Sequence, residues 1–377
     1  MSSAAVVVVG AGVVGAACAW YATRAGLRVT VVDRGPVAGG TTGAGEGNLL
    51  VSDKPAGPEL ALALHSVALW RDLATEVGGF EYEPKGGLVV SESGSGLAAL
   101  DRVSERQRSA GVDAVQVAAD DLGEYEPYLA PDLAGGCYYA QDAQVNPMLA
   151  AARLLAAARA AGASVRTGVT VTGMLRSGDR VVGVHTTAGD VPSDAVVNAA
   201  GTWSGEVAGL AGVTVPVAPR RGFILVTEPL PPIVRHKVYA SAYVDAVASD
   251  DAGLQTSPVV EGTASGPILI GSSRERVGFD RALSVPVLRR LAADATRLFP
   301  VLAEVQAIRA YTGFRPYCSD HLPAIGPDTR APGLLHACGH EGAGVGLAAG
   351  TGEVVAATLT GREPAVDLSP FQPERFG

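Results

Sequence analysis

Three glycines near the N-terminus have the spacing of a phosphate-binding turn. Gly10, Gly12 and Gly15 follow the β-branched stretch 5–9 and precede an alanine-rich segment that predicts a helix ending near Ala25. Gly10 would let the chain turn sharply, Gly12 would let the backbone approach a pyrophosphate, and Gly15 would let helix and strand pack closely. The first turn of such a helix offers free N–H groups and a positive dipole end to phosphate groups.

An acidic residue follows at the distance that a dinucleotide site requires. Residues 28–32 predict a second strand, and Asp33 ends it about 20 residues beyond the glycines, where a carboxylate accepts hydrogen bonds from ribose hydroxyls. We place Arg34 in the same site, together with Val13 and Val14 at the start of the helix. The pattern predicts a bound dinucleotide, but it does not distinguish FAD from NAD(P).

The segment after Asp33 is a long loop of small residues, 39–48, which suits a backbone lying against a flat ligand. From here the chain resembles the D-amino-acid oxidase-like flavoproteins, among them glycine oxidase, sarcosine oxidase and D-amino-acid dehydrogenase. In that family this loop passes the ribityl chain and the isoalloxazine ring of FAD. The resemblance implies FAD contacts at Thr41, Thr42, Gly45, Gly47 and Asn48. Glu46, in the same loop, either pairs with a substrate amine or faces solvent.

Three later segments carry the same resemblance: 169–172, the Asn-Ala-Ala-Gly-x-Trp-Ser stretch within 195–204, and the glycine-rich stretch 339–347 before a helix that ends near Leu359. The N-terminus of that helix would stabilise the negative charge of a reduced flavin, by about 0.3 to 2 kcal/mol. The further FAD contacts that the resemblance implies are Val171, Ala200, Gly201, Trp203, Gly342, Gly344, Val345 and Gly346.

The strands and helices expected around these residues indicate an α/β fold. The resemblance implies a Rossmann-like FAD-binding domain of the glutathione-reductase type, and a substrate domain with a mixed β-sheet covered by helices. The FAD-binding domain would be discontinuous (1–50, 140–215 and 315–377), and 51–139 with 216–314 would form the substrate domain. Residues 223–227 and 267–271 predict strands of that sheet, and 288–298 has helical spacing.

Arg315 is the principal candidate for substrate binding. It lies in Thr312-Gly313-Phe314-Arg315-Pro316, which resembles the turn whose arginine holds the substrate carboxylate in glycine oxidase-like enzymes. A guanidinium suits this task because it binds a carboxylate with two parallel hydrogen bonds. A structural salt bridge is the alternative. A second arginine that such sequences carry near Gly342 is absent here, which leaves the substrate open.

Other candidates for catalysis are Tyr239, Tyr243 and His340. The tyrosines would close the pocket or pack structurally, and His340 would influence the flavin potential or accept a proton. Sarcosine oxidases attach FAD through a cysteine whose equivalent here looks like Thr312, while Cys318 is displaced. The resemblance therefore implies non-covalent FAD, and we expect no metal.

The resemblance implies oxidation of the C–N bond of a small amino acid or secondary amine (a D-amino acid, glycine, sarcosine or a proline derivative) to an imine, by hydride transfer to flavin N5. O₂ or a separate acceptor would take the electrons. Segments 46–54 and 339–346 look closest to hydroxyproline dehydrogenase and hydrogen cyanide synthase catalytic subunits, some of which work with partner subunits. The alternatives are a flavin-binding subunit acting mainly in electron transfer, and an NAD(P)-dependent dehydrogenase.

Composition and charge limit the classes of partner and the cellular location that we expect. A formal charge of −9 argues against a nucleic-acid partner. The four cysteines are scattered, without zinc, iron–sulfur or disulfide spacing, which is typical of reduced thiols in an intracellular protein. The apolar N-terminus lacks a basic region and a cleavage site, and no run reaches the ~20 apolar residues of a spanning helix. We therefore expect a cytoplasmic protein without a transmembrane segment.

Overall fold

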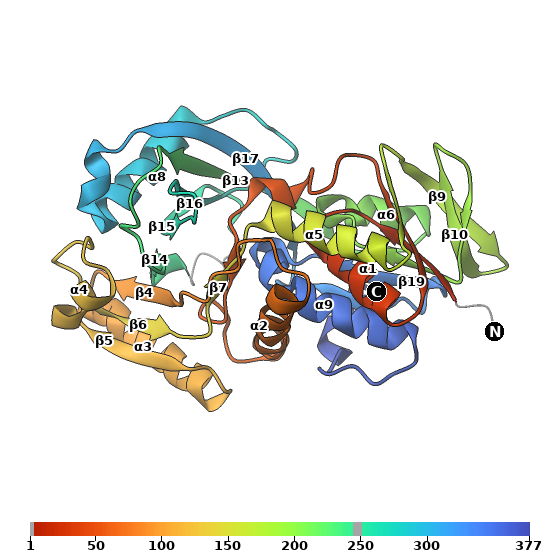
Figure 1. The fold of residues 1–377 in the computed structure, drawn as a ribbon, viewed down its shortest axis with the longest axis horizontal. Coiled ribbons are helices and arrows are strands. Elements are labelled where there is room, and N and C mark those ends of the chain that lie inside the picture. Colours follow the sequence, from red (N-terminus) through yellow and green to blue (C-terminus); the bar gives the residue numbers. More distant parts are fainter. Residues whose placement is uncertain (1–3, 244–250) are drawn as a thin grey trace.

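The computed structural model describes residues 4–243 and 251–377. Two large sheets lie side by side in Figure 1, one in each half of the molecule. The six-stranded sheet has the order β18-β19-β12-β1-β2-β8, and all of its strand pairs except β18–β19 are parallel. Its strands are β1 (Ala5–Val9), β2 (Arg28–Asp33), β8 (Ser164–Thr167), β12 (Ala195–Asn198), β18 (Ala324–Pro327) and β19 (Leu334–Cys338).

Alternate valines of β1 bury opposite faces of this sheet. Val6 and Val8 pack with helices α1 (Val13–Arg24) and α9 (Gly344–Leu359), whereas Val7 and Val9 pack with a three-stranded sheet. That small sheet contains β9 (Val171–Ser177), β10 (Arg180–Thr186) and β11 (Val191–Pro192). Because a strand side chain points to alternate faces, the run of valines predicted a strand covered on both sides, and this is confirmed.

Small residues bring the helices of this half close together. Gly352 of α9 lies so near Ala17 of α1 that an added Cβ would stand 2.6 Å from the Ala17 carbonyl carbon. Helix α1 also contacts α5 (Pro147–Ala160), and α9 contacts α2 (Pro58–Glu76). In Figure 1, α1, α5 and α9 lie in the same half of the molecule. Close helix packing explains the many alanines and glycines of the composition.

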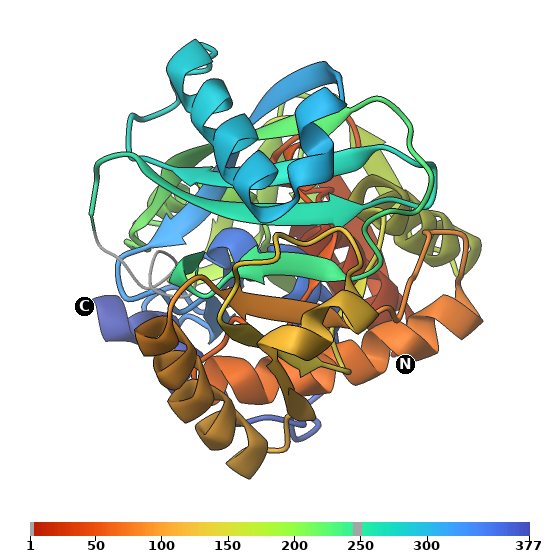
Figure 2. The same cartoon turned by 90° about the vertical axis from the view of Figure 1, so that its left-hand side faces the viewer.

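The second sheet has eight strands in the order β17-β13-β16-β15-β14-β4-β6-β5. Figure 2 shows helix α8 (Val285–Leu298) across one face of this sheet. Its strands are β4 (Gly87–Ser91), β5 (Ala114–Ala118), β6 (Gly135–Tyr139), β13 (Val217–Thr227), β14 (Lys237–Ala240), β15 (Gln255–Gly262), β16 (Ile268–Arg274) and β17 (Ala307–Cys318). The remaining elements are β3 (Asn48–Leu49), β7 (Ala143–Gln144), α3 (Gly94–Ser109), α4 (Leu122–Tyr125), α6 (Ser204–Leu210) and the 3₁₀ turns η1 (Thr41–Ala44), η2 (Ala119–Asp121), η3 (Gly201–Trp203), η4 (Pro300–Glu304), η5 (Glu341–Ala343), η6 (Ser369–Phe371) and η7 (Pro373–Phe376).

The α/β fold with two packed sheets, one largely parallel and one mixed, agrees with the predicted class. The discontinuous domain boundaries stay a prediction. The strands of each sheet come from the chain segments that were assigned to it, with β17 crossing the boundary at 315. Helix α2, which falls within the segment assigned to the substrate domain, shares the core that contains α1 and α9.

One helical stretch among the described residues, Glu341–Leu359, has the length and the mean hydropathy (1.2) of a membrane-crossing helix. This stretch is 61% buried, and α9 within it contacts α1 and α2. Burial of this kind is what the core helix of a globular protein shows. The apolar character of α9 is therefore explained by its place between two neighbouring helices.

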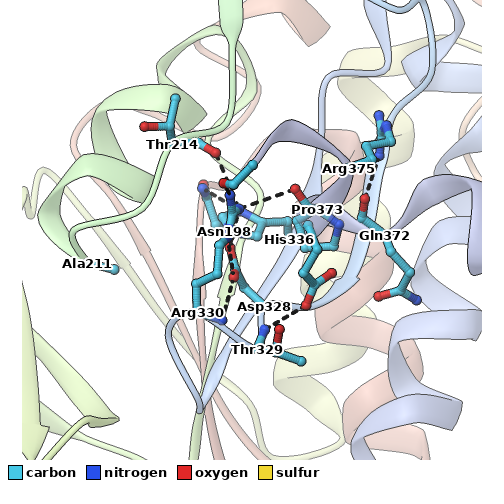
Figure 3. Close-up of polar contacts among 12 residues, drawn as sticks. Asn198, Ala211, Thr214, Asp328, Thr329, Arg330, His336, Gln372, Pro373 and Arg375 are labelled. Carbon is cyan, nitrogen blue, oxygen red and sulfur yellow. Dashed lines mark hydrogen bonds and ion pairs between the residues drawn. The ribbon is translucent and has the colours of Figure 1, made fainter.

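A buried polar network holds the turn that follows β12. Asn198 Nδ2 donates to the carbonyl of Ser204 and contacts His336 Nδ1 at 3.2 Å, and His336 Nε2 lies 3.2 Å from Asp328 Oδ2. Arg330 binds both oxygens of Asp328, at 2.9 and 2.8 Å, and also donates to the carbonyls of Pro373 and Gly377. Figure 3 shows this network joining β12, β19 and the C-terminal tail.

We expect Asp328→Asn to lower the free energy of unfolding by about 3 kcal/mol at neutral pH, because it removes one partner of a buried ion pair. Burial alone would raise the pKa of Asp328, but hydrogen bonds from Arg330 and His336 hold it well below its usual range. Its contribution is therefore complete above the ordinary carboxyl pKa of about 3.9 and is lost as the pH falls below it. Urea unfolding of both proteins across this range checks the prediction. A stability difference that stays constant at low pH would contradict it.

A cavity between the two sheets

A cavity of about 510 Å³ lies where the carboxyl ends of the parallel strands meet the edge of the eight-stranded sheet. Its walls include Val9 and Asp33 at the ends of β1 and β2, Cys338 at the end of β19, and residues of β13 and β17. Open α/β sheets bind their ligands outside the carboxyl ends of their strands. The cavity therefore has the position of a dinucleotide site that also reaches the second sheet.

The glycine turn lies against this cavity as the sequence predicts. Gly10, Gly12, Val13 and Val14 line it, and Gly10 has a φ of 119° that disfavours any other residue. Gly15 lies behind the wall, and a Cβ there would overlap the carbonyl oxygen of Gly10. Gly15 thus serves close packing, which is the role that the sequence assigned to it.

Asp33 lines the cavity and also braces the turn. Its Oδ2 accepts a hydrogen bond from Ala11 N and its Oδ1 accepts one from Gly35 N, each at 2.7 Å. A carboxylate offers about four acceptor positions, so ribose hydroxyls can still be bound. The loop residue Thr42 caps helix α1, because its Oγ1 accepts a hydrogen bond from Val13 N at 3.0 Å.

A stack of aromatic rings and an arginine joins the two sheets along the cavity. The Arg34 guanidinium lies 4.3 Å from the ring centre of Trp203, which stacks on Phe279 at 5.4 Å. Phe279 in turn meets Phe314 of β17 edge to face at 5.4 Å. Arg34, Trp203 and Phe314 line the cavity, and Thr41 Oγ1 donates to the Phe314 carbonyl at 2.6 Å.

The start of helix α9 forms another wall. Gly342, Gly344 and Val345 line the cavity, and no side chain from residues 4–243 or 251–377 caps the N-terminus of the helix. The backbone N–H groups of a first helical turn have no intrahelical partners, so this wall suits a negatively charged ring edge. These residues fit a flavin, and the glycine turn of α1 fits its pyrophosphate.

His340 lies in this wall but faces the protein interior. Its Nε2 is 3.0 Å from Thr351 Oγ1 of α9, and burial lowers the pKa of His340 to about 3. The ring is therefore neutral at physiological pH and is a poor proton acceptor. The neighbouring Glu341 has a φ of 45° and pairs with His321 at 3.0 Å and with Arg220 at 3.7 Å.

Arg315 projects from β17 into the cavity wall. The sequence interpretation of this segment as a turn is wrong, because 312–316 lie within a strand that pairs along its length with β13. Pro316 is tolerated because β17 is the edge strand of its sheet. Among the described residues, Arg315 makes one hydrogen bond, from Nη1 to the Ser273 carbonyl at 2.8 Å, and forms no ion pair within 4 Å.

Of the two candidate tyrosines, the structure brings only Tyr243 to the cavity. Tyr239 is fully buried and donates to Ser52 Oγ at 2.6 Å, so its assignment to the pocket is wrong. The other predicted cofactor residues that line the cavity are Thr41, Thr42, Gly45, Asn48, Val171, Ala200 and Gly201. Gly47 and Gly346 lie behind the wall, where a Cβ at Gly47 would overlap the Val145 carbonyl oxygen and one at Gly346 would stand 3.3 Å from the Asn48 oxygen.

Several residues of the wall were not assigned from the sequence. Gly313 and Phe314 directly precede Arg315 in β17 and could have been included by their proximity. Arg281 comes from a segment without a local signal, and only the packing of the two halves brings it to the cavity, whereas Glu206 lies two residues beyond the Asn-Ala-Ala-Gly-x-Trp-Ser stretch. Further members of the wall that the sequence did not indicate include Val207, Leu210, Gly222, Ile224, Ala337 and Cys338.

We expect acid precipitation to release flavin from the protein, because none of the described cysteines is prepared for covalent attachment. Burial raises the pKa of Cys18, Cys318 and Cys338 to about 12, so each stays a thiol at neutral pH. Cys338 lines the cavity and Cys318 does not. Absorbance of the supernatant and of the redissolved pellet measures this, and flavin retained in the pellet would contradict the prediction.

Comparison with known proteins agrees with the geometry. The family described as FAD dependent oxidoreductase matches residues 5–358. A glycine oxidase of Pseudomonas aeruginosa is 32% identical over 98% of both chains, and a hydrogen cyanide synthase subunit of the same organism is 29% identical over 98% of this chain and 96% of its own. The crystal structure of glycine oxidase from Geobacillus kaustophilus superimposes with a TM-score of 0.88, at 27% identity over 98% of both chains. The strand–glycine turn–helix, the second cofactor wall at α9 and this match over nearly the whole chain place the protein in the FAD dependent oxidoreductase family, as an enzyme that oxidises amines or amino acids.

Proposed function

We propose that the protein oxidises the C–N bond of a small amino acid or secondary amine, and that Arg315 holds the substrate carboxylate. One observation carries this proposal: Arg315 lines the same cavity as the flavin-binding residues, and the described residues offer it no carboxylate within 4 Å. A substrate carboxylate would supply the missing partner. The similarity to glycine oxidase supports the substrate class.

Burial of Arg315 supports the same assignment. Burial and the neighbouring Arg274 lower the pKa of Arg315 to about 10, so the side chain remains a cation at neutral pH. Arg315 is half-buried and has no carboxylate within 4 Å among the described residues, and an anionic ligand relieves the cost of such a cation. The cavity wall at Tyr243 and Ile224 is available to hold the rest of a small substrate.

The chain's own groups position the substrate. Arg315 would fix the carboxylate, and the side chains around it would exclude water and orient the α-carbon. FAD, when bound, supplies the chemistry, because it accepts the two electrons of the α-carbon–hydrogen bond as a hydride. The electrons would pass on to O₂ or to a separate acceptor, with or without partner subunits, and we propose a cytoplasmic location.

Anaerobic flavin bleaching tests the function. The purified flavoprotein is mixed with D-amino acids, proline derivatives, glycine and sarcosine, one at a time, and the loss of flavin absorbance is followed. Full reduction by one compound supports the proposal, and repetition in air shows whether O₂ reoxidises the flavin. If no compound of this panel reduces the flavin, the proposed substrate class is wrong and a role limited to electron transfer is favoured.

A further inference from the structure

Glu46 is a buried carboxylate in the cavity wall. Its side chain is 6% exposed, and Glu46 lines the cavity together with Arg315. Its Oε2 accepts a hydrogen bond from Asn48 Nδ2 at 3.1 Å and lies 3.3 Å from Lys237 Nζ. Its Oε1 is buried and accepts no hydrogen bond from any residue in 4–243 or 251–377. The side chain therefore does not face solvent, and one of its oxygens lacks a partner.

Lys237 does not fully compensate the charge of Glu46. Its Nζ lies closer to Glu261 Oε2, at 2.7 Å, than to Glu46. Two carboxylates thus share one ammonium group, and the cluster carries one surplus negative charge when all three groups are ionised. Glu261 is better satisfied than Glu46, because its Oε1 also accepts a hydrogen bond from Gly47 N at 3.3 Å. Of the two carboxylates, Glu46 is the one that lines the cavity and the less well satisfied.

The surroundings of Glu46 increase its affinity for protons. Burial raises the pKa of Glu46, and so does the negative charge of Glu261, while Lys237, Asn48 and Arg315 oppose the rise. Tyr311 of β17 also faces this cluster, and the negative charge of Glu46 contributes to the raised pKa of Tyr311. A carboxylate whose affinity for protons is increased in this way is a better base than one in water.

An amino-acid substrate carries a negative charge that is complementary to Arg315 and a positive charge that is complementary to Glu46. Its carboxylate would bind Arg315, and its ammonium nitrogen would bind a carboxylate in the same cavity. The ammonium must lose a proton before oxidation, because the nitrogen lone pair forms the second bond to carbon as the hydride leaves.

We propose that Glu46 binds the amine nitrogen of the substrate and accepts its proton before the C–N bond is oxidised. An N–H bond of the ammonium group breaks and an O–H bond forms on Glu46, without electron transfer. The inference rests on the proposed function, since it assigns the second charged group of the same substrate. It distinguishes Glu46 from Glu261, which pairs with the same lysine but does not line the cavity.

Two ligands of nearly equal shape test the binding step on the flavin-loaded protein. 2-Aminoisobutyrate has no α-hydrogen and resists this oxidation, and pivalate replaces its ammonium group by a methyl group. Titrations followed by the flavin spectrum give the affinity of each ligand for the wild type, Glu46→Gln and Glu261→Gln. Glutamine keeps the size of the side chain, and Lys237 retains one carboxylate in either variant.

We expect Glu46→Gln to lower the affinity for 2-aminoisobutyrate at least about tenfold, because a charge-assisted hydrogen bond to its ammonium group is lost. Pivalate should bind equally or more tightly, since a negative charge is removed from its site. Glu261→Gln should change both affinities by similar factors. Equal weakening of both ligands by Glu46→Gln would show a structural role only, and the proposal would be wrong. Failure of 2-aminoisobutyrate to bind the wild type would also overturn it.

The pH dependence of anaerobic flavin reduction tests the proton step, with whichever substrate the panel identifies. In the wild type, reduction should slow as the pH falls and Glu46 becomes protonated. In Glu46→Gln the rate should follow the ionisation of the amine itself and therefore require a higher pH, and Glu46→Asp should recover part of the wild-type profile. Unchanged profiles would refute proton transfer to Glu46.

The outcomes separate this inference from the proposed function. If the panel reduces the flavin and Glu46→Gln behaves as the wild type, only the role of Glu46 is wrong. If no compound reduces the flavin, the proton step falls with the proposed reaction. The ligand titrations then still decide whether Glu46 recognises an amine.

Discussion

Arg315→Ala is expected to raise KM for the substrate by about 100- to 1000-fold. A bidentate arginine–carboxylate contact contributes two charge-assisted hydrogen bonds, and the loss of about 3–4 kcal/mol corresponds to this factor. The flavin should remain bound, because the glycine turn at Gly10 that suits its pyrophosphate does not include Arg315, which lies beside Gly342 in another part of the wall. Steady-state kinetics and the flavin content of the same preparation measure both effects.

Two further variants make this result specific. Arg315→Lys keeps the charge but loses the planar pair of donors, so it should recover only a part of the affinity. Arg309→Ala removes an exposed arginine from the same strand, outside the cavity, and should leave KM near that of the wild type. A near-normal KM in Arg315→Ala would show that Arg315 is a structural residue. If the same variant loses flavin, the rise in KM cannot be assigned to substrate binding alone. The affinity of the flavin-reloaded variant for pivalate would then decide whether Arg315 binds the carboxylate.

Gly15→Ala is expected to lower the affinity for FAD by about 10- to 100-fold, although Gly15 does not line the cavity. Its added Cβ would overlap the carbonyl oxygen of Gly10, so the turn and helix α1 must separate. Overpacking of this kind costs about 1–3 kcal/mol and would displace the N–H groups that face the phosphates. The flavin-to-protein absorbance ratio after purification and a titration of the apoprotein with FAD measure the effect.

The matched control for this change is Gly209→Ala. Gly209 lies in helix α6, and an added Cβ there would meet no atom of the described residues within 4 Å. Alanine also favours a helix over glycine, so this variant should bind FAD normally and be at least as stable as the wild type. If Gly15→Ala retains full flavin content, the close approach at the turn is not required for cofactor binding.

The sequence by itself determined the nucleotide half of the molecule. Gly10, Gly12 and Asp33 could be placed because a strand, a turn and a helix follow one another without interruption, and each is set by a pattern of a few neighbouring residues. The resemblance to flavoproteins extended this to the loop before Asn48 and to the start of α9. Both segments line the cavity in the structure.

The predictions were less successful for residues whose surroundings come from elsewhere in the chain. The resemblance of 312–316 implied a turn at Arg315, but the segment is an edge strand, where the missing N–H group of Pro316 is tolerated. Tyr239 and Tyr243 are close in sequence, yet Tyr239 bonds Ser52 and Tyr243 reaches the cavity. No periodicity of the sequence distinguishes them.

Only the tertiary structure decided the environment of Glu46. Its partner Lys237 and the competing Glu261 come from two strands of the eight-stranded sheet, far along the chain from the cofactor loop. The network of Asn198, Asp328 and His336 likewise joins distant segments. Local patterns reflect the repeat of a helix or a strand, whereas the charge balance of a buried side chain depends on which strands become neighbours. The glycine turn therefore followed from the sequence. That one oxygen of Glu46 has no hydrogen-bond partner within the described part of the chain followed only from the fold.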